Sequence, residues 1–183
     1  QIATNDVKEI DKFYKEALKA KQEGIMLKVL DSPYVFGRHV GGWYKYKGVM
    51  ETLDLVVISA TWGEGGRSSW LTSYELACRN PNTGKFLSCG NMSTGLTEEE
   101  YKTMTDLLKK IIESSKGKIV FVKPKIVLEV AYQEIQKSPH YESGFGLRFP
   151  RFIRLREDRS KNDIASLEEI KNEYEKKREW AVQ

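Results

Sequence analysis

The apolar run at residues 53–62 constrains the fold more than any other stretch of the sequence. It combines leucine with β-branched and aromatic side chains, which is typical of a buried strand. Several shorter runs of this kind follow it, separated by Gly, Pro and Asn, and they predict further strands. Before Gly48 the pattern is that of one helix and two short strands. A domain boundary is therefore predicted at Gly48, which divides the chain into residues 1–48 and 49–183.

The second of these domains reads as a set of strands with two helices. The strands are expected at residues 53–62, 70–79, 85–89, 118–122, 125–135 and 152–156. Thr97 and the three glutamates after it form a capping-box pattern, which opens a helix whose apolar positions continue to Ile112. A last amphipathic helix is expected from Leu167. About five strands with a helix between the third and the fourth match an OB-fold barrel, although a fold does not establish a function.

Residues 1–48 carry the clearest chemical signal. The run at residues 23–28 opens with a carboxylate and closes with a lysine. A short apolar strand is expected at residues 25–30, and a second strand at residues 43–47. Lys45 and Lys47 are two positions apart, so on a strand they point to the same face and bring two ammonium groups to one site. This spacing indicates an anion-binding pocket. On spacing alone, ordinary surface lysines on two solvated strands are the favoured explanation, because lysine usually lies at the surface.

Chain length, charge and cysteine content limit the number of domains and the class of protein that the sequence can represent. The 183 residues allow one or two domains, and 30 Lys+Arg against 26 Asp+Glu give a net charge of +4, too small an excess to prove nucleic-acid binding. The excess is local, since residues 148–161 hold six basic and two acidic side chains. Cys78 and Cys89 lack metal-ligand spacing and are interpreted as reduced packing residues, with a disulfide left open for a hyperthermophilic source. No apolar run approaches about 18 residues, so we expect an intracellular protein without a membrane partner.

Three segments, taken together, resemble the motifs of one enzyme family. Residues 23–28 and 43–47 resemble motifs IV and V of the covalent nucleotidyltransferases, and residues 147–158 resemble motif VI. Their order and spacing are similar to those of the ATP-dependent DNA ligases of archaeal and eukaryotic replicative type, over nearly the whole chain. The resemblance implies a mainly β fold with some α. Residues 1–48 would be the C-terminal segment of an adenylation (nucleotidyltransferase) domain, and residues 49–183 an OB-fold domain with a C-terminal helix.

The family resemblance implies an activity, cofactors and partners. ATP-dependent DNA ligases seal nicks in duplex DNA through lysyl-AMP and DNA-adenylate intermediates, with ATP as AMP donor and Mg²⁺ as metal, in replication, repair and recombination. Their nucleophilic lysine lies in a Lys-x-Asp-Gly motif, which this sequence lacks. The nucleophile is therefore expected upstream, and the 183 residues alone are expected to be inactive. The implied partners are nicked duplex DNA and the upstream adenylation and DNA-binding domains. Contact with a sliding clamp is left open. The expected location is the cytoplasm for an archaeal protein and the nucleus for a eukaryotic one.

The resemblance also implies roles for single residues. Lys45 and Lys47 would be catalytic, and Glu23 would hold the divalent metal. The residues implied at the nucleotide are Glu23, Lys28, Arg38, Lys45, Lys47, Arg154, Arg156, Asp158 and Arg159. Those implied at the DNA are Gly65, Gly66 and Arg67, in a glycine-rich loop. Arg159 stands where the family usually has lysine, and a forked guanidinium is not equivalent to an ammonium group.

Two other functions are consistent with parts of the sequence. A non-catalytic OB-fold module that binds nucleic acid or a partner protein would explain residues 49–183, but it has no use for the paired strands of a nucleotide site. A relative that caps mRNA or ligates RNA would explain those strands. The run at residues 147–154 and the Gly-x-Gly-x-Arg loop at residues 63–67 favour the DNA ligases over these relatives.

Overall fold

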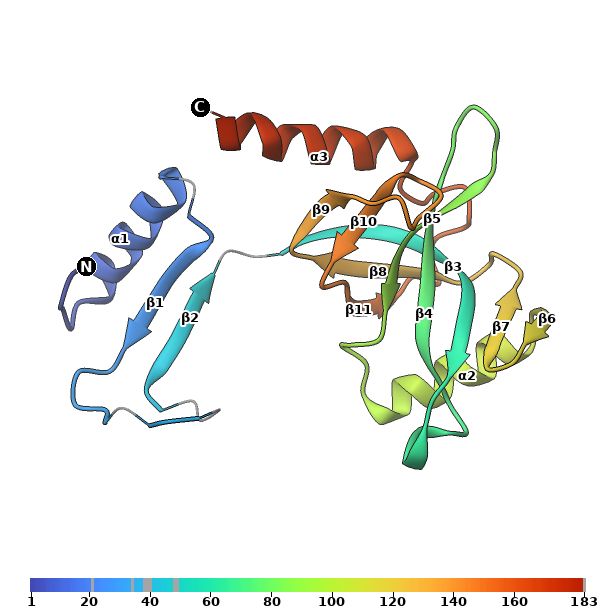
Figure 1. The fold of residues 1–183 in the computed structure, drawn as a ribbon, viewed down its shortest axis with the longest axis horizontal. Coiled ribbons are helices and arrows are strands. Elements are labelled where there is room, and N and C mark those ends of the chain that lie inside the picture. The colour runs from blue at the N-terminus through green and yellow to red at the C-terminus, as the bar shows by residue number, and fades with distance from the viewer. Residues whose placement is uncertain (21, 34, 38–40, 48–49, 183) are drawn as a thin grey trace. The chain divides into compact units, whose positions relative to one another are not determined.

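The structure, a computed structural model, forms two compact units, built from residues 1–49 and from residues 50–179 (Figure 1). Side chains are described as far as residue 176. The residues that the structure describes are 1–20, 22–33, 35–37, 41–47 and 50–182.

The smaller unit consists of a helix on a two-stranded hairpin. Helix α1 (Val7–Lys19) begins after Asp6, whose carboxylate accepts a 2.9 Å hydrogen bond from the backbone N–H of Lys8. This is the capping role for which aspartate is preferred at a helix start. The ring of Tyr14 on α1 lies 4.5 Å from that of Tyr46 on the hairpin, measured between centroids. None of the described residues of this unit is fully buried.

The hairpin consists of β1 (Gly24–Lys28) and β2 (Trp43–Lys47), which pair antiparallel. Both strands were expected from the sequence. The first was expected to reach Leu30, but it ends two residues earlier, where the backbone N–H of Val29 bonds to the carbonyl of Gly42.

The larger unit is built on a seven-stranded antiparallel sheet. Its strands are β3 (Glu51–Trp62), β4 (Leu71–Arg79), β5 (Phe86–Met92), β6 (Ile112–Lys116), β7 (Ile119–Val122), β8 (Val127–Tyr132) and β11 (Arg151–Leu155). The main path runs β11–β8–β3–β4–β5, and β7 pairs with both β3 and β6. A further pair is formed by β9 (Glu134–Lys137) and β10 (Phe145–Arg148).

The segment at residues 145–155 closes the sheet into a barrel. Strand β10 lies beside β5, and β11, which follows β10 after two residues, pairs with β8 (Figure 1). Two backbone hydrogen bonds support the closure, from Ser143 to Ser88 at 3.1 Å and from Phe152 to Thr94 at 2.9 Å. The path therefore returns from β11 and β10 to β5, which is the closed arrangement of an OB-type barrel. The predicted fold class is confirmed.

The barrel interior is apolar, and helices cover it. Buried side chains of β3, β4, β5 and β8 form its core, and α2 (Glu98–Lys109) adds Tyr101, Met104 and Leu108. The capping box that opens α2 is present as predicted. Helix α3 (Leu167–Val182) contributes the fully buried Ile170. Within the described part of the chain, no helix has the length and apolar character needed to cross a membrane.

Three details of the predicted elements are wrong. Helix α2 ends at Lys109, and Ile112 opens strand β6 because that segment pairs with β7. The segment expected as one strand at residues 125–135 is two strands, β8 and β9, separated at Gln133, whose backbone N–H bonds to the carbonyl of Arg148 at 3.0 Å. Strand β10 was not predicted, because its pairing partner β9 had been merged with β8.

Candidate functional site

The hairpin carries three lysines on one face. Lys45 lies opposite Met26, Lys47 opposite Gly24, and Lys28 opposite Trp43. Residues directly opposite each other in an antiparallel pair share a face, and alternate residues of one strand do so too. Lys28, Lys45 and Lys47 therefore share a face, whereas Tyr46 points to the other side and packs on α1. The register extends the predicted lysine pair to a row of three.

The three lysines differ in their contacts. The Nζ atom of Lys47 lies 3.5 Å from Oε2 of Glu23, an exposed ion pair of modest strength. The Nζ atom of Lys28 lies 3.9 Å from the centroid of the Trp43 ring, in cation–π geometry. For Lys45 no hydrogen bond or ion pair to another described residue is found, and its side chain is exposed. Lys45 is thus the ammonium group most available to an anion.

The metal prediction rests on Glu23 alone. Its side chain is 68% exposed, and the described residues contain no group of three or more His, Cys, Asp or Glu that could hold a metal ion. A nucleotide-bound Mg²⁺ commonly takes one or two protein carboxylates together with phosphate oxygens and water, so a single carboxylate fits this kind of site. Arg38, the other residue implied at the nucleotide in this unit, lies outside the described residues.

A recess of about 580 Å³ lies between α1 and the 25–31 segment. Its lining is mostly apolar and includes Phe13, Ile25 and Leu27. Among the described residues that are implied at the nucleotide, only Lys28 borders it. The exposed lysine face, and not this recess, carries the groups that suit a phosphate.

In the barrel, Arg156 is held by two carboxylates. Its Nη1 donates to both oxygens of Asp54, at 3.0 and 2.8 Å, while Nε and Nη2 donate to the two oxygens of Asp158, at 2.9 and 2.8 Å. The Arg156 side chain is only 11% exposed and that of Asp54 16%, whereas that of Asp158 is 64% exposed. One half-buried and one exposed carboxylate therefore bind different parts of the same guanidinium.

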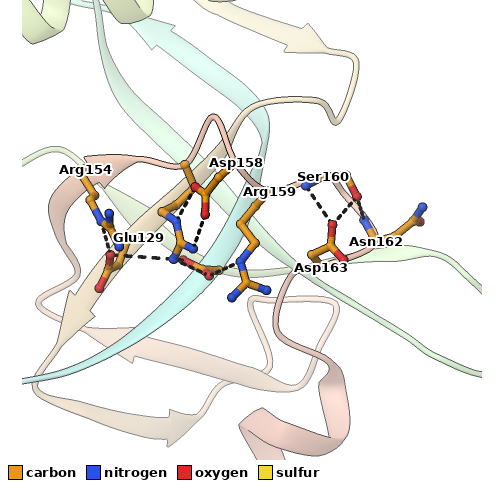
Figure 2. A network of polar contacts seen from close by, with 9 residues as sticks. Glu129, Arg154, Asp158, Arg159, Ser160, Asn162 and Asp163 are labelled. Carbon is orange, nitrogen blue, oxygen red and sulfur yellow. Dashed lines mark hydrogen bonds and ion pairs between the residues drawn. The ribbon is translucent and has the colours of Figure 1, made fainter.

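Two further arginines, Arg154 and Arg159, flank Arg156 and its two carboxylates (Figure 2). Nε of Arg154 lies 2.6 Å from Oε2 of Glu129, and Nε of Arg159 lies 3.7 Å from Oδ2 of Asp54. Both guanidinium side chains are well exposed, at 62% and 44%. The hydrogen bond from Arg154 lowers the pKa of Glu129, and that from Arg156 lowers the pKa of Asp158. Glu129 and Asp158 are therefore ionised at neutral pH.

This network brings together Arg154, Arg156, Asp158 and Arg159, the barrel residues that the resemblance implies at the nucleotide. It also contains Asp54 and Glu129, which the sequence reasoning missed. A signal for Asp54 was available, since it is the one carboxylate inside the apolar run at residues 53–62. Glu129 gave no comparable signal, because only the strand register places it opposite Asp54.

The glycine-rich loop is an ordered turn. Gly65 has φ +58° and begins a 3₁₀ turn (Gly65–Arg67) closed by backbone hydrogen bonds of 3.1 Å. A Cβ placed on Gly65 or Gly66 would meet no atom within 4 Å, so the backbone there faces open space. The guanidinium of Arg67 lies 5.3 Å from the Tyr101 ring centroid. The turn thus presents an exposed backbone next to a cation–aromatic pair.

Helix α2 extends this cation–aromatic surface. The Nζ atom of Lys102 lies 5.5 Å from the Trp70 ring, and that of Lys109 lies 5.5 Å from the Trp62 ring. The rings of Trp70 and Tyr101 stack almost in parallel, with centroids 6.5 Å apart. Sequence reasoning missed these lysines, because their ring partners, Trp62 at the end of β3 and Trp70 just before β4, are far from α2 in the sequence.

Phe149 is a second unpredicted feature. It connects β10 to β11 with φ +51°, the only positive φ of a non-glycine residue in the described part of the chain, and it is 64% exposed. The guanidinium of Arg148 lies 5.2 Å from its ring centroid. Such backbone strain is disfavoured and often marks a functional position.

The closed barrel and the lysine-bearing hairpin together define a class of protein: an OB-fold domain preceded by a piece of a nucleotidyltransferase domain. Residues 67–159 match the family described as ATP dependent DNA ligase C terminal region, and residues 1–47 match the ATP dependent DNA ligase domain. The chain belongs to the ATP-dependent DNA ligase family.

Curated relatives cover the chain almost completely. The DNA ligase of Archaeoglobus fulgidus is 52% identical over 174 residues, which are 95% of this chain and 31% of that protein. The DNA ligase of Thermococcus onnurineus is 46% identical over 175 residues, 96% of this chain and 31% of that protein. The chain thus spans about a third of the length of these relatives.

Solved structures show the same architecture. The ligase domain of M. tuberculosis LigD matches with a TM-score of 0.54 and 26% identity, over 85% of this chain and 51% of that one. The ligase structure titled Pmar-Lig_Pre matches with a TM-score of 0.62 and 23% identity, over 82% of this chain and 30% of that one, and this likeness concerns the fold alone.

Proposed function

We propose that this chain is the C-terminal part of an enzyme that uses ATP to seal nicks in duplex DNA inside the cell. The observation that carries the proposal is the row of Lys28, Lys45 and Lys47 on one exposed face of the hairpin, at the positions of motifs IV and V. A module that only binds nucleic acid has no need for this row beside a complete OB-fold barrel.

The lysine row suits the chemistry of adenylate transfer. Attaching AMP to a lysine, moving it to a 5′-phosphate and displacing it with a 3′-hydroxyl each pass negative charge through phosphorus, and the protein must position the groups and neutralise that charge. Lys45 and Lys47 take this role at the AMP phosphate, with Lys28 beside them. Glu23 supplies the one carboxylate for Mg²⁺, which when bound neutralises charge on the phosphate oxygens.

The barrel supplies a second set of cations. Arg154, Arg156 and Arg159, with Asp158, serve to orient the pyrophosphate of ATP, and the exposure of Arg154 and Arg159 supports this assignment. Arg38 is assigned to the nucleotide from the family resemblance.

The barrel also provides contacts for the DNA. The turn of Gly65, Gly66 and Arg67 would contact the sugar–phosphate backbone, where cationic contacts position a duplex without reading its sequence. Sequence-independent contacts suit an enzyme that acts on nicks anywhere in a genome. The remaining ligase domains are the second partner, and contact with a sliding clamp stays a prediction from the resemblance.

Labelled ATP tests this assignment of the chain. No covalent AMP should form on the 183 residues in the presence of Mg²⁺, because they contain no Lys-x-Asp-Gly nucleophile. The full-length ligase should be labelled under the same conditions and should seal a nicked duplex. Covalent AMP on the isolated chain, or a full-length protein that neither takes up AMP nor seals nicks, would contradict the proposal.

A further inference from the structure

Two carboxylates face each other in the barrel wall. Asp54 on β3 lies directly opposite Glu129 on β8, and the two side chains are only 16% and 18% exposed. Like charges directly opposite each other on neighbouring strands destabilise a sheet, and removing carboxylates from water adds to the cost. Conflicts of this kind between local charge and stability are expected at functional sites.

Arginines resolve the conflict. Arg154 on β11 lies opposite Glu129 in the strand register, so Arg154, Glu129 and Asp54 form one row across three strands. Nη1 of Arg156 lies 2.8 Å from Oδ2 of Asp54 and 3.9 Å from Oε2 of Glu129, and Nε of Arg159 lies 3.7 Å from the same oxygen of Asp54. Asp54 thus contacts Arg156 and Arg159, two of the motif VI arginines, while Glu129 contacts Arg154 and, at 3.9 Å, Arg156.

The two carboxylates on Arg156 differ in what holds them. Asp54 lies within a long strand, and its backbone carbonyl also accepts a 2.9 Å hydrogen bond from the N–H of Ala165. Asp158 lies in the turn after β11 and is mostly exposed. It occupies the Nε–Nη2 edge of the guanidinium, the edge at which a phosphate is bound in forked geometry. Asp54 is the partner that a strand holds in place, and Asp158 is the partner that lies in an exposed turn.

We propose that Asp54 is a positioning residue, which holds Arg156 and Arg159 so that they can receive the triphosphate of ATP. This inference rests on the proposed function. Asp54 acts through the arginines and does not touch the nucleotide itself. Its effect should therefore be confined to the step that uses ATP and should be absent from the step that joins an already adenylated nick.

The experiment compares these two steps in the full-length ligase. Asp54→Asn keeps the size of the side chain and one acceptor oxygen but removes the charge. The rate of enzyme adenylation at subsaturating ATP should fall by about tenfold, the loss expected for a charged hydrogen bond. Sealing of a duplex that carries a pre-adenylated 5′ end needs no ATP and should change by less than about twofold. Asp54→Glu restores the carboxylate and should adenylate faster than Asp54→Asn.

A matched control shows whether the effect is specific to Asp54 or follows from the loss of any carboxylate of the barrel. Asp106→Asn removes one exposed carboxylate from α2 of the same barrel and should leave both steps unchanged. Equal losses of adenylation and of sealing in both Asp54 variants would show a structural role only and would overturn the inference, as would unchanged adenylation in Asp54→Asn. If the unaltered enzyme neither adenylates nor seals, the proposed function fails instead, and this is seen before any variant is compared.

Discussion

Glu129 shows how strongly single side chains of the barrel are coupled to their neighbours. Its carboxylate accepts a 2.6 Å hydrogen bond from Arg154, which lowers its pKa from the ordinary value of 4.5. A carboxyl group whose pKa is lower in the folded state stabilises the fold above its unfolded pKa. That contribution is lost as the pH falls through the folded pKa. Acid should therefore destabilise the chain partly by protonating Glu129.

The melting temperature of the 183-residue chain tests this coupling between about pH 6 and pH 3. Glu129→Gln cannot be titrated, so its melting temperature should fall less over this interval than that of the unaltered chain. Glu113→Gln, which removes an exposed carboxylate from β6, is the control and should keep the original pH dependence. Identical curves for Glu129→Gln and the unaltered chain would show that the ion pair with Arg154 does not contribute.

At this scale the sequence predicts only what is local. The spacing of Lys45 and Lys47 is enough to place them on one face, because side chains alternate along any strand. The partnership of Asp54 with Arg156 depends on the register of three strands, so no local pattern contains it. Residues far apart in the sequence that meet across a barrel wall can be recognised only once the pairing is known.

The elements of the barrel also divide into those that the local sequence predicts and those that depend on strand pairing. Strand β3 and helix α2 follow from composition and from a capping box, which are strong local signals. Strand β6, with the sequence Ile-Glu-Ser-Ser-Lys, has only exposed residues, and it exists because β7 offers a pairing edge. Strand β10 likewise takes its place from β5 and β9. Tertiary pairing decides the elements whose own sequences are weak.

The turn of Gly65–Arg67 is the element assigned to DNA. Arg67→Ala in the 183-residue chain should weaken binding to a nicked duplex and reduce the slope of log affinity against log salt by about one. Lys85→Ala removes an exposed cation from the β4–β5 hairpin and serves as the control. If Arg67→Ala and Lys85→Ala have the same affinity and salt slope, the turn does not contact the DNA backbone.

At the scale of the whole molecule, the proposed reaction draws on different cations from the two units. The hairpin unit offers the row of Lys28, Lys45 and Lys47, and the barrel offers the arginines of motif VI. Among its described residues the hairpin unit has none that is fully buried, and the chain spans about a third of the relatives it matches. Activity is therefore a property to be measured in the longer protein.

Transfer of labelled AMP from ATP to the full-length ligase tests the central claim, that the lysine row serves the nucleotide. Lys45→Ala removes the ammonium group that is most available to a phosphate, and Lys12→Ala removes an exposed lysine from α1 as the matched control. The rate of labelling should fall by at least about a hundredfold in Lys45→Ala, the loss typical of a group that stabilises transition-state charge. Lys12→Ala should be labelled at the rate of the unaltered enzyme. Labelling of Lys45→Ala at that same rate would remove the hairpin from the nucleotide site and contradict the claim.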